Sequence, residues 1–204
     1  VSGVYRLEIT GFRKASEQDQ KQVIASQMLS EAEQLRQKWN KESLQNAIHK
    51  YAAAYGVWQS IADQRQQAAT LKNIGDVWEI LSEQQKALNC FTRAQKLYKE
   101  LKDRKGEIAT LNTIAASYVY RGENQKALDI SNQALGMIPT INDSWENARA
   151  LHNLGAALYG MNDMQKAKEA LNEAMRLRQE LPDRSGQAET ILYLGYIQHA
   201  LKNT

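Results

Sequence analysis

The sequence predicts an all-α protein, a right-handed superhelical solenoid of antiparallel helix pairs. The first observation is a repeat at a constant step, because Gln-Lys-Ala begins at Gln85, Gln125 and Gln165. The second is the spacing of apolar residues three and four apart within each unit, which is typical of amphipathic helices. The third is composition, since only two prolines occur among 204 residues and strong helix formers dominate.

Composition and charge narrow the classes of function. A net charge of +3 is too small to indicate nucleic-acid binding by itself. The chain has no run of about 18 apolar residues, so we expect no membrane span. Its single cysteine, Cys90, excludes an internal disulfide and a cysteine metal cluster. A globular binding domain is the remaining expectation.

Two columns of alanine mark each repeat and predict where the helices make their closest contacts. Small side chains let helix axes approach to the near end of the usual range of roughly 8–10 Å. Larger neighbours such as Trp78 and Phe91 then fill the space beside each contact. The columns are Ala47, Ala87, Ala127 and Ala167, followed by Ala54, Ala94, Ala134 and Ala174.

A column of aspartates separates the repeats. Each aspartate precedes the apolar pattern of a first helix, where a carboxylate can accept bonds from free backbone N–H groups. We therefore interpret these residues as helix caps and not as catalytic acids. The column consists of Asp63, Asp103, Asp143 and Asp183.

The repeat divides the chain into four parts. Residues 1–15 alternate apolar and polar side chains at Tyr5, Leu7 and Ile9, which predicts a β-strand-like remnant or linker of a preceding domain. Residues 16–62 form a degenerate first repeat, in which we expect a turn three residues longer than in the others. Three 40-residue repeats follow over 63–182. Residues 183–204 are the first helix of a further, truncated repeat, which we expect to be frayed or covered by another copy of the chain.

The repeat resembles the tetratricopeptide repeat (TPR), whose pattern is matched here by Leu71, Ile74, Gly75, Trp78, Ala87, Phe91 and Ala94. The usual unit has about 34 residues, and the unit here is longer. The longer form, with "DRKGEIATLNTIA" opening the first helix, is similar to repeats of kinesin light chains and of bacterial proteins that carry a caspase-like CHAT protease domain. The resemblance covers the chain from about residue 16 to residue 204.

The resemblance implies a protein-interaction scaffold that binds a peptide or protein segment in a concave groove lined by the first helix of each pair. An asparagine amide there can pair with both the N–H and the C=O of an extended peptide. The amides could instead solvate the groove or bond to the helix opposite. Four residues are suited to hold an apolar side chain, namely Tyr159, Tyr193, Tyr196 and Val119. The predicted peptide-binding residues are Lys72, Asn73, Asp76, Asn112, Thr113, Ala116, His152, Asn153, Ala156, Tyr159, Tyr193 and Tyr196.

No pattern for catalysis is visible, so we expect neither an enzyme activity, nor a cofactor, nor a metal. The histidines His49, His152 and His199 lack the spacing of metal ligands, and no glycine-rich phosphate loop occurs. We expect a protein or peptide partner, no nucleic acid, no membrane, and possible self-association through the uncovered last helix. The chain resembles the docking or sensor arm of a larger bacterial protein. Two alternatives are an intramolecular regulatory arm of a CHAT-type protease and a structural self-associating array.

Overall fold

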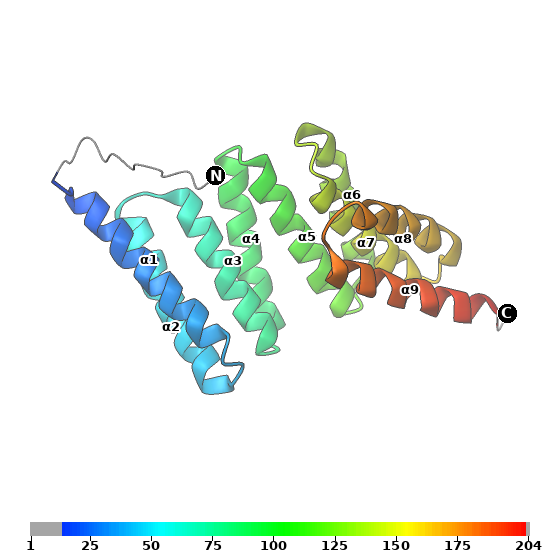
Figure 1. Ribbon diagram of the computed structural model, residues 1–204, viewed down its shortest axis with the longest axis horizontal. Helices are drawn as coiled ribbons and strands as arrows, with labels where there is room; N and C mark the ends of the chain where they lie inside the picture. The colour runs from blue at the N-terminus through cyan, green and yellow to red at the C-terminus, as the bar shows by residue number, and fades with distance from the viewer. Residues whose placement is uncertain (1–13, 203–204) are drawn as a thin grey trace, which may run out of the picture.

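The computed structural model describes residues 14–202, and this range contains nine α-helices and no strand. The helices stack in chain order from α1 at one end to α9 at the other (Figure 1). Consecutive helices pack as antiparallel pairs, and α9 follows the last pair. Their bounds are α1 Glu17–Arg36, α2 Lys41–Ser60, α3 Gln64–Ile80, α4 Gln84–Glu100, α5 Arg104–Tyr120, α6 Asn124–Met137, α7 Ser144–Gly160, α8 Met164–Gln179 and α9 Arg184–Lys202, with a 3₁₀ turn at Ile138–Thr140.

The all-α prediction is thus confirmed, with helix pairs in sequence as expected. The predicted strand around Tyr5 lies outside the described residues. No helix within 14–202 is both long and apolar enough to cross a membrane.

The aspartate column caps the first helices, as predicted. The Asp63 carboxylate accepts a bond from the backbone N–H of Gln66 at 3.0 Å, and Asp103 does the same for Gly106. Asp143 and Asp183 cap α7 and α9 in the same way. These bonds satisfy N–H groups that a helix leaves free at its start, so one residue type fixes four helix starts at a constant step.

A residue with left-handed backbone occupies six successive turns, at every twentieth position of the chain. Only one of these positions is a glycine, although glycine adopts positive φ most easily. Each repeat holds two such turns, so their spacing of 20 residues gives the 40-residue step. The residues are Ala62, Ser82, Lys102, Gly122, Asn142 and Asn162, with φ between 47° and 70°.

The first pair departs from this step for a reason that differs from our prediction. The turn at 37–40 is one residue longer than the turn at 81–83, not three. The extra length lies in α2, which has 20 residues against 17 in α4. Asn40 caps α2 by accepting the N–H of Ser43 at 2.9 Å, and this strong cap starts the helix almost one turn early.

The alanine columns lie where the helices meet. Every alanine of both columns, from Ala47 to Ala174, has an exposed fraction of 0%. These alanines are thus buried between packed helices, because a side chain of this size at zero exposure requires neighbours on all sides.

Within a repeat, the residue opposite the glycine column varies in size to match it. A Cβ atom added at Gly75 would overlap the Phe91 ring, and one at Gly155 would lie 2.6 Å from Leu171. Where the column holds Ala115, the counterpart of Phe91 one repeat later is the smaller Ser131. Large side chains therefore face glycine and a small one faces alanine. The sizes of the two facing residues thus compensate for each other in each helix pair.

Neighbouring first helices do not approach each other equally. Helix α5 packs directly against α7, whereas α3 and α5 share few contacts. Similar ion pairs link successive repeats at the helix starts, with Arg65 to Asp103 and Lys105 to Asp143 both at 2.8 Å. The difference between the two joints therefore lies further along the helices, where the predicted site residues are.

Candidate functional site

The predicted site residues all lie on α3, α5, α7 and α9, whose shared surface we call the first-helix face. They differ in accessibility, because α7 packs against α5 as well as against α8 and α9. The half-buried or exposed members are Lys72, Asn73, Asp76, Ala116, Tyr159, Tyr193 and Tyr196, and the buried members are Asn112, Thr113, His152, Asn153 and Ala156.

The two buried asparagines connect neighbouring helices. The Asn112 amide donates to the backbone oxygen of Glu146 at 2.9 Å and to its carboxylate at 2.8 Å. The Asn153 amide donates to the backbone oxygen of Asn112 at 2.9 Å. These bonds match the alternative in which the amides bind the helix opposite, so a peptide would have to compete for their N–H groups. Asn73, on the more open α3, is half-buried.

His152 also serves the packing of three helices. Its Nδ1 lies 3.2 Å from the Thr190 hydroxyl of α9, and the Arg178 guanidinium of α8 lies 3.5 Å away. Arg178 donates to Thr190 and to the Gly186 backbone oxygen. Burial first and the Arg178 charge second lower the pKa of His152 to about 4. The imidazole is therefore neutral at pH 7 and is held inside the fold, away from a ligand.

Three tyrosines form an aromatic cluster on the first-helix face. The Tyr159 ring meets Tyr193 edge-on with centroids 5.9 Å apart and stacks on Tyr196 at 6.1 Å. Tyr193 and Tyr196 also meet edge-on at 6.2 Å. Such pairs hold each other in place and keep their rings preorganised. Burial raises the pKa of Tyr193, so its phenol stays neutral.

These tyrosines line a cavity of about 340 Å³, which we call the aromatic pocket. Val119 and Ala156 add apolar walls, and Tyr196 remains 47% exposed. The structure thus brings together the three tyrosines and Ala156 of the predicted set, joined by Val119. The pocket is open, mostly apolar and edged by phenol groups, which suits one apolar or aromatic side chain.

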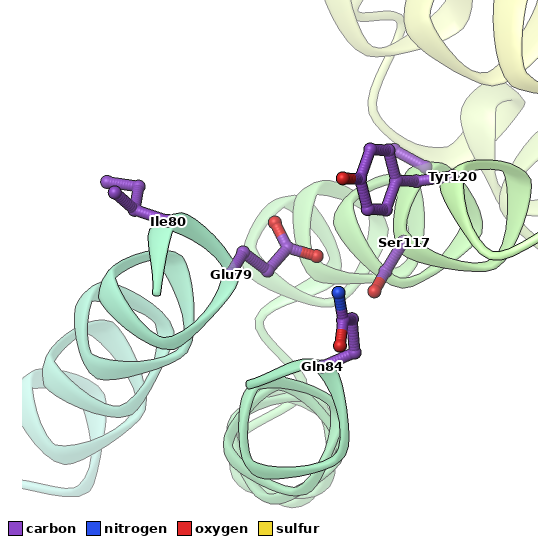
Figure 2. Close-up of a pocket in the computed structure, with 6 residues that line it drawn as sticks. Glu79, Ile80, Gln84, Ser117 and Tyr120 are labelled. Atoms are coloured by element: carbon purple, nitrogen blue, oxygen red, sulfur yellow. The ribbon is translucent and has the colours of Figure 1, made fainter. Parts of the chain in front are cut away.

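A second pocket of about 350 Å³ lies where α3 ends, α4 begins and α5 passes, and we call it the acidic pocket. Figure 2 shows Glu79, Gln84 and Ser117 directed toward a common space, with the Tyr120 ring beside it. Ile80 and Ala116 complete the lining. Of these residues only Ala116 is among the predicted site residues.

The acidic pocket was detectable from the repeat, but its chemistry was not. Glu79, Gln84 and Ala116 stand one full repeat before Val119, Asn124 and Ala156, which all line the aromatic pocket. The positions are thus equivalent, but their side chains differ, so the repeat indicates where a pocket lies and not which ligand group it suits.

The described residues 14–202 contain no group of three or more His, Cys, Asp or Glu side chains placed to hold a metal ion. Lys72 and Asp76 form an ion pair at 3.1 Å within α3. Of the charged groups of α3 on this face, Lys72 and Asp76 thus pair with each other and Glu79 lines the acidic pocket. This arrangement suits the recognition of a ligand better than the binding of a metal ion.

No protein-family model matches the chain, and no curated protein matches it. Among solved structures, the apo form of RapI is 19% identical with a TM-score of 0.69, covering 80% of this chain and 45% of RapI. The TPR-like repeats of a putative kinesin light chain from Podosopora anserina are 14% identical with a TM-score of 0.66, covering 88% of this chain and 89% of that one.

The first TPR of Spaghetti (RPAP3), solved with an HSP90 peptide, SRMEEVD, is 18% identical with a TM-score of 0.52. That likeness covers 67% of this chain and 94% of the RPAP3 domain. At these identities the likeness concerns the fold. The sequential helix pairs, the buried alanine columns and these neighbours lead to one conclusion: the chain is a TPR-like helical repeat protein.

Proposed function

We propose that this chain is a peptide-binding module, with the first-helix face as the concave groove of a right-handed superhelix. The observation that carries the proposal is the aromatic pocket of Tyr159, Tyr193 and Tyr196, open on that face. TPR-like repeat folds typically mediate protein–peptide binding, and one structural neighbour holds an HSP90 peptide. The aromatic pocket offers an anchoring point for a segment of that kind.

Tyrosines suit this role because of their size and stiffness. A tyrosine presents a large contact area and loses little conformational freedom when it binds, since it has only two side-chain torsions. The ring contacts in the cluster fix those torsions before a ligand arrives. An apolar or aromatic peptide side chain that enters the cavity would therefore gain buried area at low entropic cost.

The charges near the groove argue against a strongly acidic peptide. Lys72 is paired with Asp76, and Glu79 lies one turn further along α3. An acidic segment would meet two carboxylates and one lysine that already has a partner. We therefore propose a neutral or basic segment as the ligand.

Replacing Tyr196 with alanine is expected to weaken peptide binding at least tenfold, because it removes one wall of the aromatic pocket. A random peptide display library, selected on the whole chain, supplies the probe, and fluorescence anisotropy measures the dissociation constant. Trp39→Ala is the matched control, since Trp39 is 71% exposed in the turn before α2 and far from the pocket. Equal affinities for wild type and Tyr196→Ala, or no selected peptide at all, would contradict the proposal.

A second candidate function, self-association, is favoured by the exposed apolar surface of α9. Ile191 and Leu192 are 60% and 52% exposed on this helix. Apolar groups of this size gain about 25 cal/mol for each Å² removed from water. Ile197 is buried against α8, so the last helix is only half covered.

We expect light scattering to give a mass that rises with concentration toward twice the 23.1 kDa of the chain. Ile191→Asp should return the mass to that of one chain, because an interface would then bury an unpaired carboxylate. Ser185→Asp, at an exposed position of the same helix, is the control for added charge. A constant monomer mass in the wild type at all concentrations would reject self-association.

The segment bound in the groove could come from the same polypeptide. This form of the proposal makes the chain a docking or sensor arm of a larger bacterial protein, including one with a CHAT-type protease domain. It rests on the similarity of "DRKGEIATLNTIA" to repeats of such proteins. The full reading frame decides it, since a frame without a further domain leaves no segment for the arm to hold.

A further inference from the structure

The acidic pocket and the aromatic pocket occupy equivalent places in successive repeats. Glu79, Gln84 and Tyr120 of the first correspond, one repeat later, to Val119, Asn124 and Gly160 of the second. Helix α5 lines both cavities, with Ser117 and Tyr120 in one and Val119 in the other. A segment that runs along the first-helix face and fills one pocket therefore passes the other.

The chemistry of the acidic pocket calls for a cation. Burial raises the pKa of Glu79 and the negative charge of Asp76 adds to the rise, while the nearby Ser117 hydroxyl opposes it. The positive charge of Lys72 lowers that pKa as the smallest of these effects, and the Lys72 ammonium is paired with Asp76 at 3.1 Å. The Glu79 carboxylate is thus partly desolvated and has no ion pair of its own. A positively charged group of a ligand would supply that partner.

The Ser117 oxygen beside the Glu79 carboxylate favours a cation with more than one N–H donor. The Ser117 hydroxyl is buried and lies close enough to Glu79 to lower the pKa of that carboxyl, but it makes no hydrogen bond of good geometry among the described residues. The Gln84 side chain points toward the same space with its amide nitrogen foremost (Figure 2), so it adds a donor and leaves the Ser117 oxygen as the acceptor. A buried oxygen without a partner costs free energy, and a donor that reaches it removes that cost.

The exposed aromatic ring at the rim adds a planar surface. Tyr120 is 79% exposed and lines the pocket beside Ser117. Tyrosine rings attract a guanidinium group placed over their face. Arginine combines a fixed charge, five N–H donors and a planar group, whereas lysine offers a compact ammonium without a plane to stack.

We propose that the acidic pocket is a subsite for an arginine side chain of the peptide that the aromatic pocket anchors. The guanidinium pairs with Glu79, donates to the Ser117 hydroxyl oxygen and stacks on Tyr120. This inference rests on the proposed function. Helix α5 lines both pockets and is about 10–12 Å across with its side chains, and an extended chain advances about 3.3 Å per residue, so the arginine and the apolar anchor stand about three residues apart.

The test uses capped synthetic hexapeptides with one arginine and one tryptophan, separated by two serines. The comparison peptide carries citrulline, which has the shape of arginine but no charge. We expect the wild-type chain to bind the arginine peptide at least tenfold more tightly than the citrulline peptide, by isothermal titration calorimetry. In Glu79→Gln this preference should disappear, while the affinity for the citrulline peptide stays within about twofold.

Two variants separate the pocket from its surroundings. Glu100→Gln removes a carboxylate from the exposed end of α4, where it pairs with Lys96 at 3.9 Å, and it should keep the full arginine preference. Ser117→Ala places at this position the residue that the next repeat has at Ala157, so it should fold normally and lose part of the preference.

The outcomes distinguish this inference from the proposed function. Equal binding of the arginine and citrulline peptides, with Tyr196→Ala still weakening both, overturns the arginine subsite and keeps the peptide groove. A preference that survives in Glu79→Gln also overturns it. Light scattering on the same samples tests one other occupant, because a dimer that Glu79→Gln dissolves would assign the pocket to a second copy of the chain and overturn the inference.

Discussion

Replacing Phe91 with alanine is expected to lower the free energy of unfolding by about 3–5 kcal/mol. The ring is fully buried and packs with Ala87 and Ile114. Its edge occupies the space over Gly75, which has no Cβ atom to collapse into the vacancy. The cavity would therefore stay open, and lost contacts would add to the lost transfer free energy. Urea unfolding followed by far-UV circular dichroism measures the change.

The control exploits the size match between Phe91 and Gly75. In the wild type, Gly75→Ala should cost about 1–3 kcal/mol, because the new methyl group would overlap the ring. In the Phe91→Ala background the same change should stabilise the fold by up to about 1 kcal/mol, since alanine is the better helix former. A cost of equal sign in both backgrounds would show that the two residues do not compete for one space.

Acidification through the range from the unfolded to the folded pKa of His152 is expected to destabilise the fold by about 3 kcal/mol. The pKa falls from 6.5 to about 4 on folding because the imidazole is buried and faces Arg178. Over this range the unfolded chain takes up a proton that the folded chain does not, which favours unfolding as pH falls. Below the folded pKa the loss is complete, and above the unfolded pKa it is absent.

His152→Asn isolates this contribution, because Asn112 holds the equivalent position one repeat earlier. In urea titrations at a series of pH values, the variant should show a flatter dependence of unfolding free energy on pH between the two pKa values. Asp183 also acts on His152, since its negative charge raises the pKa that Arg178 lowers. It is present in both proteins and does not affect the comparison. Parallel curves for wild type and variant would mean that His152 is protonated in the folded chain.

The fold was largely predictable because its determinants repeat. Three features return at a fixed step, namely the buried alanines, the capping aspartates and the turns that reverse the chain. Each of them has one dominant physical role. The early start of α2 was not predictable from the columns, because it depends on a local competition that Asn40 wins as a cap.

The candidate site was predictable only in part. The three tyrosines were named because their positions in the repeat put them on the same face of the first helices, and the structure brings their rings together. The hydrogen bonds between α5 and α7 were only one of the alternatives left open for the asparagine amides, because they depend on side chains that vary at a constant position. Asn112 reaches Glu146 there, whereas Lys72, its equivalent, has only donors and pairs within its own helix. Such a difference is visible only when the two helices are placed side by side.

The unequal spacing of the first helices has a mechanical consequence. The joint between α5 and α7 is held by side-chain amide hydrogen bonds, while the joint between α3 and α5 has few contacts to resist bending. Elastic deformation of the stack should therefore concentrate at the softer joint, which is also the joint that the acidic pocket spans. A peptide bound in both pockets would bridge this flexible joint, limit its bending and stiffen the whole helical stack.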